Sequence, residues 1–277
     1  DRLRGSPPPQ QVPINQIQKQ PIVTYTILVL AVIIYILQLA SQNLMGGTDL
    51  PAFYGMKVNE FILQGQYWRL ITPVFLHGSI MHLGFNMYAL FILGPMLERL
   101  YGHGRFLGLI LVSGFAGNVM SFLFSAAPSL GSSTAIFGLL GAQGVLLYQN
   151  RQFYGSVAQR ALINLIVIAG INLVIGLSPG IDNWGHIGGL LGGTLFAWFG
   201  GPVLAVEGVA PNYHVVNRRP MGDSFRAGLS VFVLFGLVTV VYVFLQMSCG
   251  CEYANTCHRG RGVYREPYLC RTASGWL

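Results

Sequence analysis

The chain has 277 residues, of which 53% are hydrophobic and only 9% are charged, and its mean hydropathy is +0.55. Soluble domains carry roughly a quarter charged residues, so this composition excludes an ordinary soluble domain. The net charge of +7 does not indicate a nucleic-acid partner, because the basic residues lie singly or in pairs between apolar segments. Repeated apolar stretches of about 20 residues predict instead an all-α fold, a polytopic membrane helix bundle.

The predicted elements follow one another with little intervening sequence. Residues 1–20 are rich in Pro and Gln and are expected to form a flexible cytoplasmic lead-in. Seven spans are then predicted, at Ile22–Ala40, Ile80–Leu97, Phe106–Phe124, Ser133–Tyr148, Ala161–Leu177, Gly185–Leu204 and Ala227–Met247. The expected organisation is a six-span core (21–204), a cytoplasmic linker (205–226), a seventh span (227–247) and a C-terminal tail (248–277).

Positive charge is distributed unevenly among the predicted loops. With the N-terminus in the cytoplasm, ten of the 16 Lys and Arg residues lie on the cytoplasmic side, and the outer loops hold only Lys57 and Arg69. This bias follows the positive-inside rule, so we expect that orientation, in the plasma (cell) membrane. Spans two, four and six then begin on the extracytoplasmic face, and the residues at their starts are brought together.

Polar residues open these three spans, where their cost in a bilayer indicates function. Ser133 opens the fourth and His186 the sixth, while His82 and Asn86 share one face of the second. A serine hydroxyl becomes nucleophilic when an imidazole takes its proton, so Ser133 and His186 are predicted to form a catalytic pair. The run that includes Gly131 lets the fourth helix begin abruptly. Its free N–H groups, with donors from His82 and Asn86, can stabilise an oxyanion.

A third catalytic group is not evident beside this pair. Asp182 lies four residues before His186, but we expect it to face solvent, and a dyad is therefore preferred to a triad. Phe137, one turn beyond Ser133, is a candidate to stack on the imidazole and orient it.

Other residues near these positions have structural interpretations. Ser132 is the better candidate for a plain N-cap, and His77 is expected to structure the loop entrance. The pairs Gly189/Gly193 and Gly188/Gly192 have small-xxx-small spacing and are expected to bring the sixth span close to the fourth.

Taken in order, these residues resemble the rhomboid intramembrane serine proteases over roughly residues 67–200. The matching motifs are Trp68-Arg69, His77-x4-His82-x3-Asn86, Glu98-Arg99 ahead of Gly102, Gly131-x-Ser133 and His186-x2-Gly189-x3-Gly193. Each motif is weak alone, but the ordered set is specific. The resemblance implies a rhomboid-like six-helix core, with the seventh C-terminal span making a six-plus-one form.

The resemblance also implies an activity. Ser133 would be the nucleophile of a serine endopeptidase and His186 its general base, with His82, Asn86 and the Ser133 N–H at the oxyanion. Trp68-Arg69 would anchor the first loop in the interface. The substrates would be single-span or polytopic membrane proteins cut in or near the bilayer. No cofactor or metal is implied.

Three positions depart from the family's usual residues. Thr134 stands where a second glycine is common, and its Cβ is expected to narrow the pocket without removing a donor. Gly185 stands where alanine is frequent, and Phe137 replaces a tyrosine while retaining the stacking surface.

Two further questions stay open from the sequence. Cys249, Cys251, Cys257 and Cys270, with His258, match no well-marked zinc pattern, so disulfides or free thiols are favoured over metal.

The alternative function is a non-catalytic rhomboid-like protein that binds and routes membrane clients. A transporter is disfavoured because the spans hold almost no carboxylates, and a metalloprotease because His-Glu-x-x-His is absent from the sequence.

Overall fold

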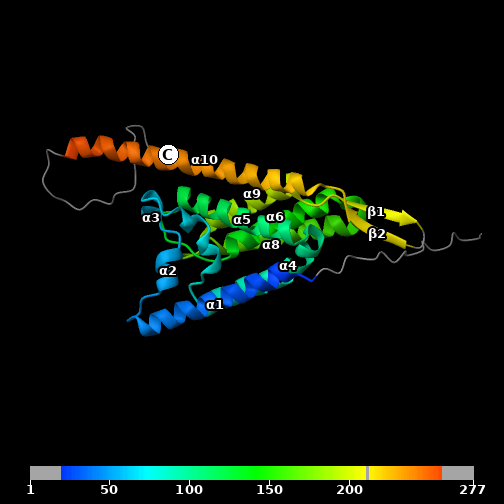
Figure 1. The fold of residues 1–277 in the computed structure, drawn as a ribbon, viewed down its shortest axis with the longest axis horizontal. Coiled ribbons are helices and arrows are strands. Elements are labelled where there is room, and N and C mark those ends of the chain that lie inside the picture. The colour runs from blue at the N-terminus through cyan, green and yellow to red at the C-terminus, as the bar shows by residue number, and fades with distance from the viewer. Residues whose placement is uncertain (1–19, 210–211, 258–277) are drawn as a thin grey trace, which may run out of the picture.

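The computed structural model describes residues 20–209 and 212–257, and each of the seven predicted spans is a helix in it (Figure 1). The long helices are α1 (Ile22–Leu44), α4 (Ile80–Tyr101), α5 (His103–Phe124), α6 (Ser133–Gln149), α8 (Ser156–Ile175), α9 (Asn183–Gly200) and α10 (Met221–Cys257). The short elements are α2 (Leu50–Gly55), α3 (Asn59–Leu63), η1 (Tyr67–Leu70), η2 (Thr72–Phe75), α7 (Arg151–Tyr154), β1 (Leu204–Val209) and β2 (Asn212–Asn217). The predicted all-α helical bundle is therefore confirmed.

Five of these helices, α1, α4, α5, α8 and α10, are long and apolar enough to cross a membrane within the part of the chain that is described. The other two long helices, α6 and α9, open with the polar residues singled out above. α6 has only 17 residues, and most of them are buried. A short helix that carries polar groups is tolerated inside a membrane where protein, rather than lipid, surrounds it.

The centre of the bundle is formed by α5, α6 and α9, and glycines on α9 allow their close approach. A Cβ at Gly189 or Gly193 would collide with backbone atoms of Thr134 or Gly138 on α6. The pair Gly188/Gly192 differs from our expectation, because its faces meet Met120 and Ala116 of α5 instead. One residue along a helix turns its surface by about 100°, so the two glycine pairs serve two different neighbours.

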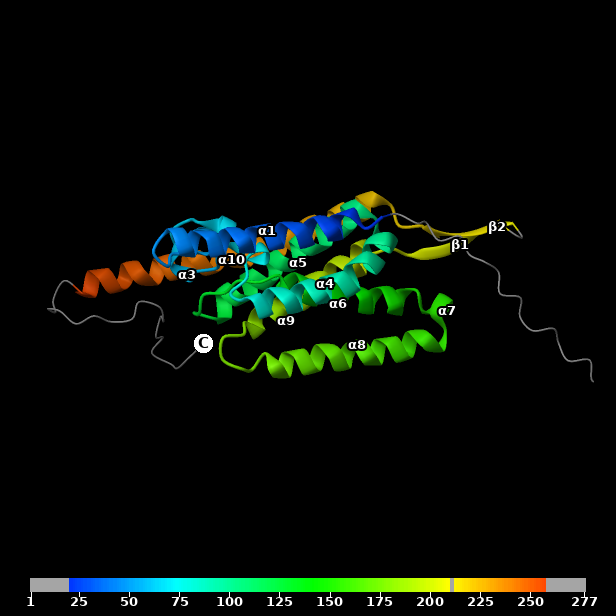
Figure 2. The same ribbon diagram turned by 90° about the horizontal axis from the view of Figure 1, so that it is seen from below.

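The outer helices attach to this centre in different ways. Glu98 at the end of α4 accepts hydrogen bonds from the N–H groups of Val23 and Thr24, at 2.8 and 2.7 Å, and thereby caps α1. His103 Nδ1 lies 2.6 Å from the same carboxylate. α10 packs on α5 and α9, with Phe115 and Phe232 stacked at 4.4 Å. In contrast, α8 lies along the side of the bundle, and most of its residues are exposed (Figure 2).

The segment 205–226, predicted as a linker, contains most of a two-stranded sheet that was not expected from the sequence. β1 and β2 pair antiparallel, from Leu204 opposite Asn217 to Val209 opposite Asn212, and extend beyond the helices (Figure 1). The Val-rich stretches here are typical of strands. α9 consequently ends at Gly200 instead of Leu204, and α10 begins at Met221 instead of Ala227.

Two predicted segments fall wholly or largely outside the described residues. The lead-in is described only at residue 20, and Cys270 and His258 lie beyond the last described residue. α10 continues past Met247 to Cys257, so the helix extends ten residues into the segment predicted as a tail.

Candidate active site

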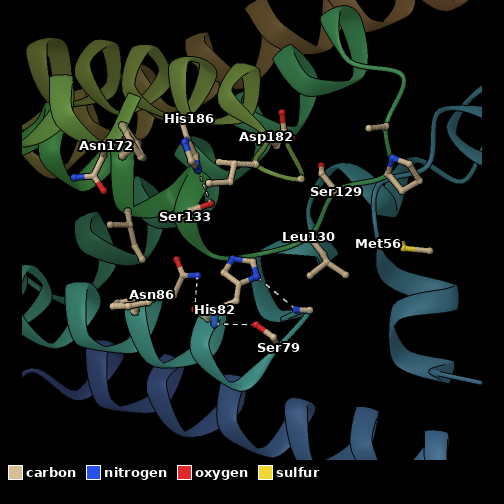
Figure 3. A pocket seen from close by; sticks show the side chains of 18 of the residues that line it. Met56, Ser79, His82, Asn86, Ser129, Leu130, Ser133, Asn172, Asp182 and His186 are labelled. Carbon is tan, nitrogen blue, oxygen red and sulfur yellow. Dashed lines mark hydrogen bonds between the residues drawn. The ribbon is translucent and has the colours of Figure 1, made fainter. Parts of the chain in front are cut away.

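Ser133 and His186 lie side by side although 53 residues separate them in the sequence. His186 Nε2 is 2.9 Å from Ser133 Oγ, a distance at which the hydroxyl can donate to the imidazole. The Phe137 ring stacks on the His186 ring, with centroids 4.3 Å apart and planes inclined by 11°. Phe137 therefore fixes the plane of the imidazole. The edge of the His186 ring points at Ser133 (Figure 3).

The starts of two helices position this pair. Ser133 is the first residue of α6, after Gly131, whose φ of +133° suits glycine. A Cβ on Gly131 would lie 2.7 Å from the His82 ring, so the glycine also keeps that ring next to the serine. His186 lies in the first turn of α9, where Asp182 Oδ1 accepts from the Gly185 N–H at 3.0 Å.

His82 and Asn86 line the same cavity from α4, opposite α9 (Figure 3). The cavity measures about 710 Å³ and opens between α4, α6, α8 and the loop over 125–130. Asn86 Nδ2 donates to His82 O at 2.9 Å, which leaves its second N–H uncommitted. The Gly78 N–H approaches His82 Nδ1 at 3.5 Å, an arrangement that favours the tautomer with its proton on Nε2. Both side chains can therefore donate into the cavity.

A polar network beside the site was not predicted from the sequence. The buried His77 places Nε2 3.2 Å from Ser132 Oγ. Its backbone is clamped by the buried Gln38 of α1, whose amide accepts from His77 N at 3.1 Å and donates to His77 O at 3.2 Å. Ser132 therefore differs from our expectation, because its hydroxyl bonds His77 and caps no backbone N–H of α6. Gln38 could have been singled out from the sequence, because a polar side chain within an apolar span indicates a specific role.

The loop over 125–130 is held over the cavity by Lys57. The backbones of Lys57 and Ser129 exchange two hydrogen bonds, at 2.9 and 3.1 Å. The Lys57 ammonium also donates to the carbonyl oxygens of Ser125 and Ala127, at 2.7 and 2.9 Å. Burial lowers the pKa of Lys57 to about 8. This lysine was counted only as loop charge in the sequence, yet it fixes one wall of the site.

We predict that His77 makes the protein sensitive to mild acid. Burial, with a smaller contribution from the facing His82, lowers the pKa of His77 from 6.5 to about 4. The unfolded chain therefore binds a proton below pH 6.5 that the folded protein does not bind until near pH 4. The His77 contribution to stability is then complete above pH 6.5 and is lost as the pH falls toward 4, on the order of 3 kcal/mol.

The measurement is thermal unfolding of the purified protein at pH values from 8 to 4. A His77→Gln variant keeps a polar group near Ser132 but cannot titrate, so its Tm is expected to fall less steeply than that of the wild type. Parallel Tm curves for the two proteins would rule out His77 as the source of the acid sensitivity.

A carboxylate partner for His186 is missing among the described residues. Asp182 is partly buried instead of facing solvent as we expected, and it caps α9 without bonding the imidazole. His186 Nδ1 is buried and forms no hydrogen bond to a described residue. Within the described residues, the imidazole of His186 is therefore oriented by packing against Phe137.

Thr134 does not narrow the cavity, contrary to our expectation. It is absent from the cavity lining, and its buried side chain lies between α5 and α9. A Cβ on Gly117 would meet Thr134 Cβ at 2.6 Å, and a Cβ on Gly185 would meet Thr134 Cγ2 at 3.0 Å. The two departures at 134 and 185 therefore face each other across the α6–α9 contact.

The Trp68-Arg69 pair divides its roles. Trp68 is exposed and donates from Nε1 to Tyr54 O at 3.0 Å, as suits an interfacial residue. Arg69 differs from our expectation of an interfacial anchor, because it is buried and bonds the carbonyl oxygens of Met56 and Phe53, at 2.8 and 2.9 Å. Its guanidinium holds the loop's own backbone together.

Comparison with known proteins identifies the class of membrane protein that this chain resembles. The Rhomboid domain model matches residues 64–203. The chain is 44% identical over 212 residues to "RHOMBOID-like protein 6, mitochondrial" of Arabidopsis thaliana, which covers 72% of this chain and 67% of that protein. It is 43% identical over 179 residues to "Rhomboid protease GluP" of Bacillus subtilis (strain 168), covering 64% of this chain and 34% of that protein.

The chain therefore belongs to the rhomboid family, and it is an integral, multi-pass membrane protein. It is also 34% identical over 205 residues to "RHOMBOID-like protein 9, chloroplastic" of Arabidopsis thaliana, covering 73% of this chain and 47% of that protein. The chain spans between about a third and somewhat over half of the length of the first curated relatives that it matches.

Proposed function

We propose that this protein is an intramembrane serine endopeptidase that uses Ser133 and His186 to hydrolyse peptide bonds in or near the transmembrane segments of membrane proteins. The observation that carries the proposal is the 2.9 Å contact between His186 Nε2 and Ser133 Oγ at the wall of an open cavity. Family membership and the relative named as a rhomboid protease support it.

The chemistry follows from the two helix starts. His186 Nε2 takes the hydroxyl proton as Ser133 Oγ attacks the substrate carbonyl carbon, and it then gives that proton to the leaving amine. Water hydrolyses the resulting ester by the same route in reverse, and the free serine is restored. Because Phe137 stacks on the imidazole, the ring stays aligned without a carboxylate partner.

The developing oxyanion would lie between α4 and α6. The Ser133 backbone N–H is one of the free donors at the start of α6, and His82 and Asn86 add side-chain donors from α4. The N-terminal end of the α6 dipole favours negative charge at this point. Three donors from two helices would then meet the charge as it forms.

We predict that Asn86→Ala lowers kcat by roughly 10-fold or more, because one preorganised oxyanion donor is lost. KM is expected to change much less, since Asn86 would bond the oxyanion and not the ground-state carbonyl. The measurement is steady-state cleavage of a single-span substrate in proteoliposomes. An unchanged kcat would remove Asn86 from this role.

We infer that the cavity opens on the extracytoplasmic side of the plasma (cell) membrane. The helix ends and connecting segments opposite the cavity carry six arginines, which are Arg99, Arg105, Arg151, Arg218, Arg219 and Arg226. The loop between α1 and α4 contains only two basic residues, Lys57 and Arg69. This distribution supports a cytoplasmic N-terminus.

A mechanism-based probe tests the proposal directly. A fluorophosphonate or isocoumarin is expected to label Ser133, and labelling should disappear in Ser133→Ala. The matched control is Ser132→Ala, since that neighbouring hydroxyl bonds His77 and not His186. A protein that binds membrane clients but takes no label would instead favour the non-catalytic alternative.

A further inference from the structure

A second cavity lies far from Ser133, between α5 and the start of α10. Its volume is about 430 Å³, and almost all of its lining is apolar. Three glycines, Gly104, Gly108 and Gly228, contribute to the lining, so the groove is hollow where side chains would otherwise fill it. Phe196 and Phe232 form part of the groove's wall. Arg105 lies at the end of the groove that is nearest the start of α5.

The charge of Arg105 is not neutralised by the described protein. Arg105 Nε donates to Ser224 Oγ and Nη2 donates to Arg219 O, both at 2.7 Å. These bonds hold the guanidinium at the groove but leave Nη1 without an acceptor in the described ranges. Neither Arg105 nor Arg219 forms an ion pair within those ranges.

A neighbouring groove on the α9 side of α10 provides an internal comparison. It has a similar volume, about 420 Å³, and its arginine is Arg226. There Arg226 Nη1 lies 3.3 Å from Asp223 Oδ1, so that groove carries its own counter-charge. The groove at Arg105 therefore differs in presenting a guanidinium without a counter-charge beside an apolar channel.

We propose that this groove binds an anionic glycerophospholipid, with the phosphate on Arg105 and an acyl chain along α5. The two chemical features that such a lipid needs occur together here. Guanidinium donors match phosphate oxygens, and basic pockets between spanning helices at a membrane face suit anionic headgroups. From Arg105 to Val112 the groove follows about 10 Å of helix, which accommodates part of one acyl chain.

A zwitterionic lipid would fill the apolar channel equally well, so the headgroup preference is the decisive property. The lipid would also connect α5 to α10, because Ser224 and Met221 of α10 line the groove together with Arg105 of α5. The proposal does not depend on the catalytic activity of the protein.

Native mass spectrometry of the full chain in detergent, with added phosphatidylglycerol or phosphatidylcholine, tests the proposal. We expect roughly 10-fold or stronger preference for phosphatidylglycerol, lost in Arg105→Gln and kept in Arg105→Lys. Arg226→Gln is the matched control and should keep the preference. Gly108→Leu fills the channel while favouring the helix, and it should abolish retention of the preferred lipid.

Three results would overturn the proposal. Equal binding of the two lipids would show that the groove does not select a headgroup. A preference retained in both Arg105→Gln and Gly108→Leu would place the lipid elsewhere. Displacement of phosphatidylglycerol by an equal concentration of soluble glycerol 3-phosphate would show a free-anion site, in which the apolar channel takes no part.

Discussion

Alanine at Ser133 or at His186 is expected to lower kcat/KM for a single-span membrane substrate by about ten-thousand-fold or more. Neither half of the pair can act alone, since the hydroxyl is a weak nucleophile without a base and the imidazole has no other acceptor for an acyl group. The double variant should therefore lose about as much activity as either single variant. The measurement is cleavage in proteoliposomes, with the cut site identified by mass spectrometry.

A substitution at the residue before Ser133 supplies the control for this experiment. Ser132→Ala removes a hydroxyl one residue away and leaves the 2.9 Å contact between His186 and Ser133 intact, so most activity should remain. Two results would contradict the dyad. One is cleavage that persists in both alanine variants, and the other is losses that multiply in the double variant, as independent groups would give.

The broad design of this site was predictable because topology determines it. Apolar segments of sufficient length predict seven helices, and their alternating direction brings the starts of the second, fourth and sixth to one face. The polar residues at these starts then had to lie near one another. The close approach of α6 and α9 was likewise predictable from Gly189 and Gly193, since only glycine lets two helix backbones come so near.

The sequence could not predict the hydrogen-bond partner of a side chain that has several possible partners. The hydroxyl of Ser132 could cap its own helix or bond another group, and the distant His77 determines the outcome. Arg69 could reach the interface, but carbonyl oxygens of its own loop bind it first. The β1–β2 hairpin was missed because its strands are short and hidden between two strongly apolar spans.

The departures at positions 134 and 185 lead to the second large effect. The family often has glycine after the serine and alanine before the histidine, whereas this chain has Thr134 and Gly185. A Cβ on Gly185 would lie 3.0 Å from Thr134 Cγ2 and 2.8 Å from Asp182 Oδ2. Asp182 Oδ2 bonds no described group, so it can turn aside while Oδ1 keeps its hydrogen bond to the Gly185 N–H. Thr134 cannot, because it is buried against Gly117.

We therefore expect Gly185→Ala alone to push α9 away from α6. Overpacking of this kind typically costs about 1–3 kcal/mol. His186, next to the added methyl group, would shift by less than the misplacement of about 1 Å that costs roughly 100-fold, so we expect kcat/KM to fall by roughly 10-fold. Thr134→Gly alone leaves a void and lowers stability without the collision. In the double variant Thr134→Gly/Gly185→Ala the added methyl group occupies the space that the threonine vacates, and activity should largely return.

A double-mutant cycle on Tm and on kcat/KM measures this coupling. Gly170→Ala on α8 is the matched control, since a Cβ there would meet nothing within 4 Å and the substitution should be harmless. Additive losses from the two substitutions would mean that Thr134 and Gly185 do not share one space. Strong coupling would instead mean that the serine and histidine helices keep their separation through a single methyl group, which either helix can supply.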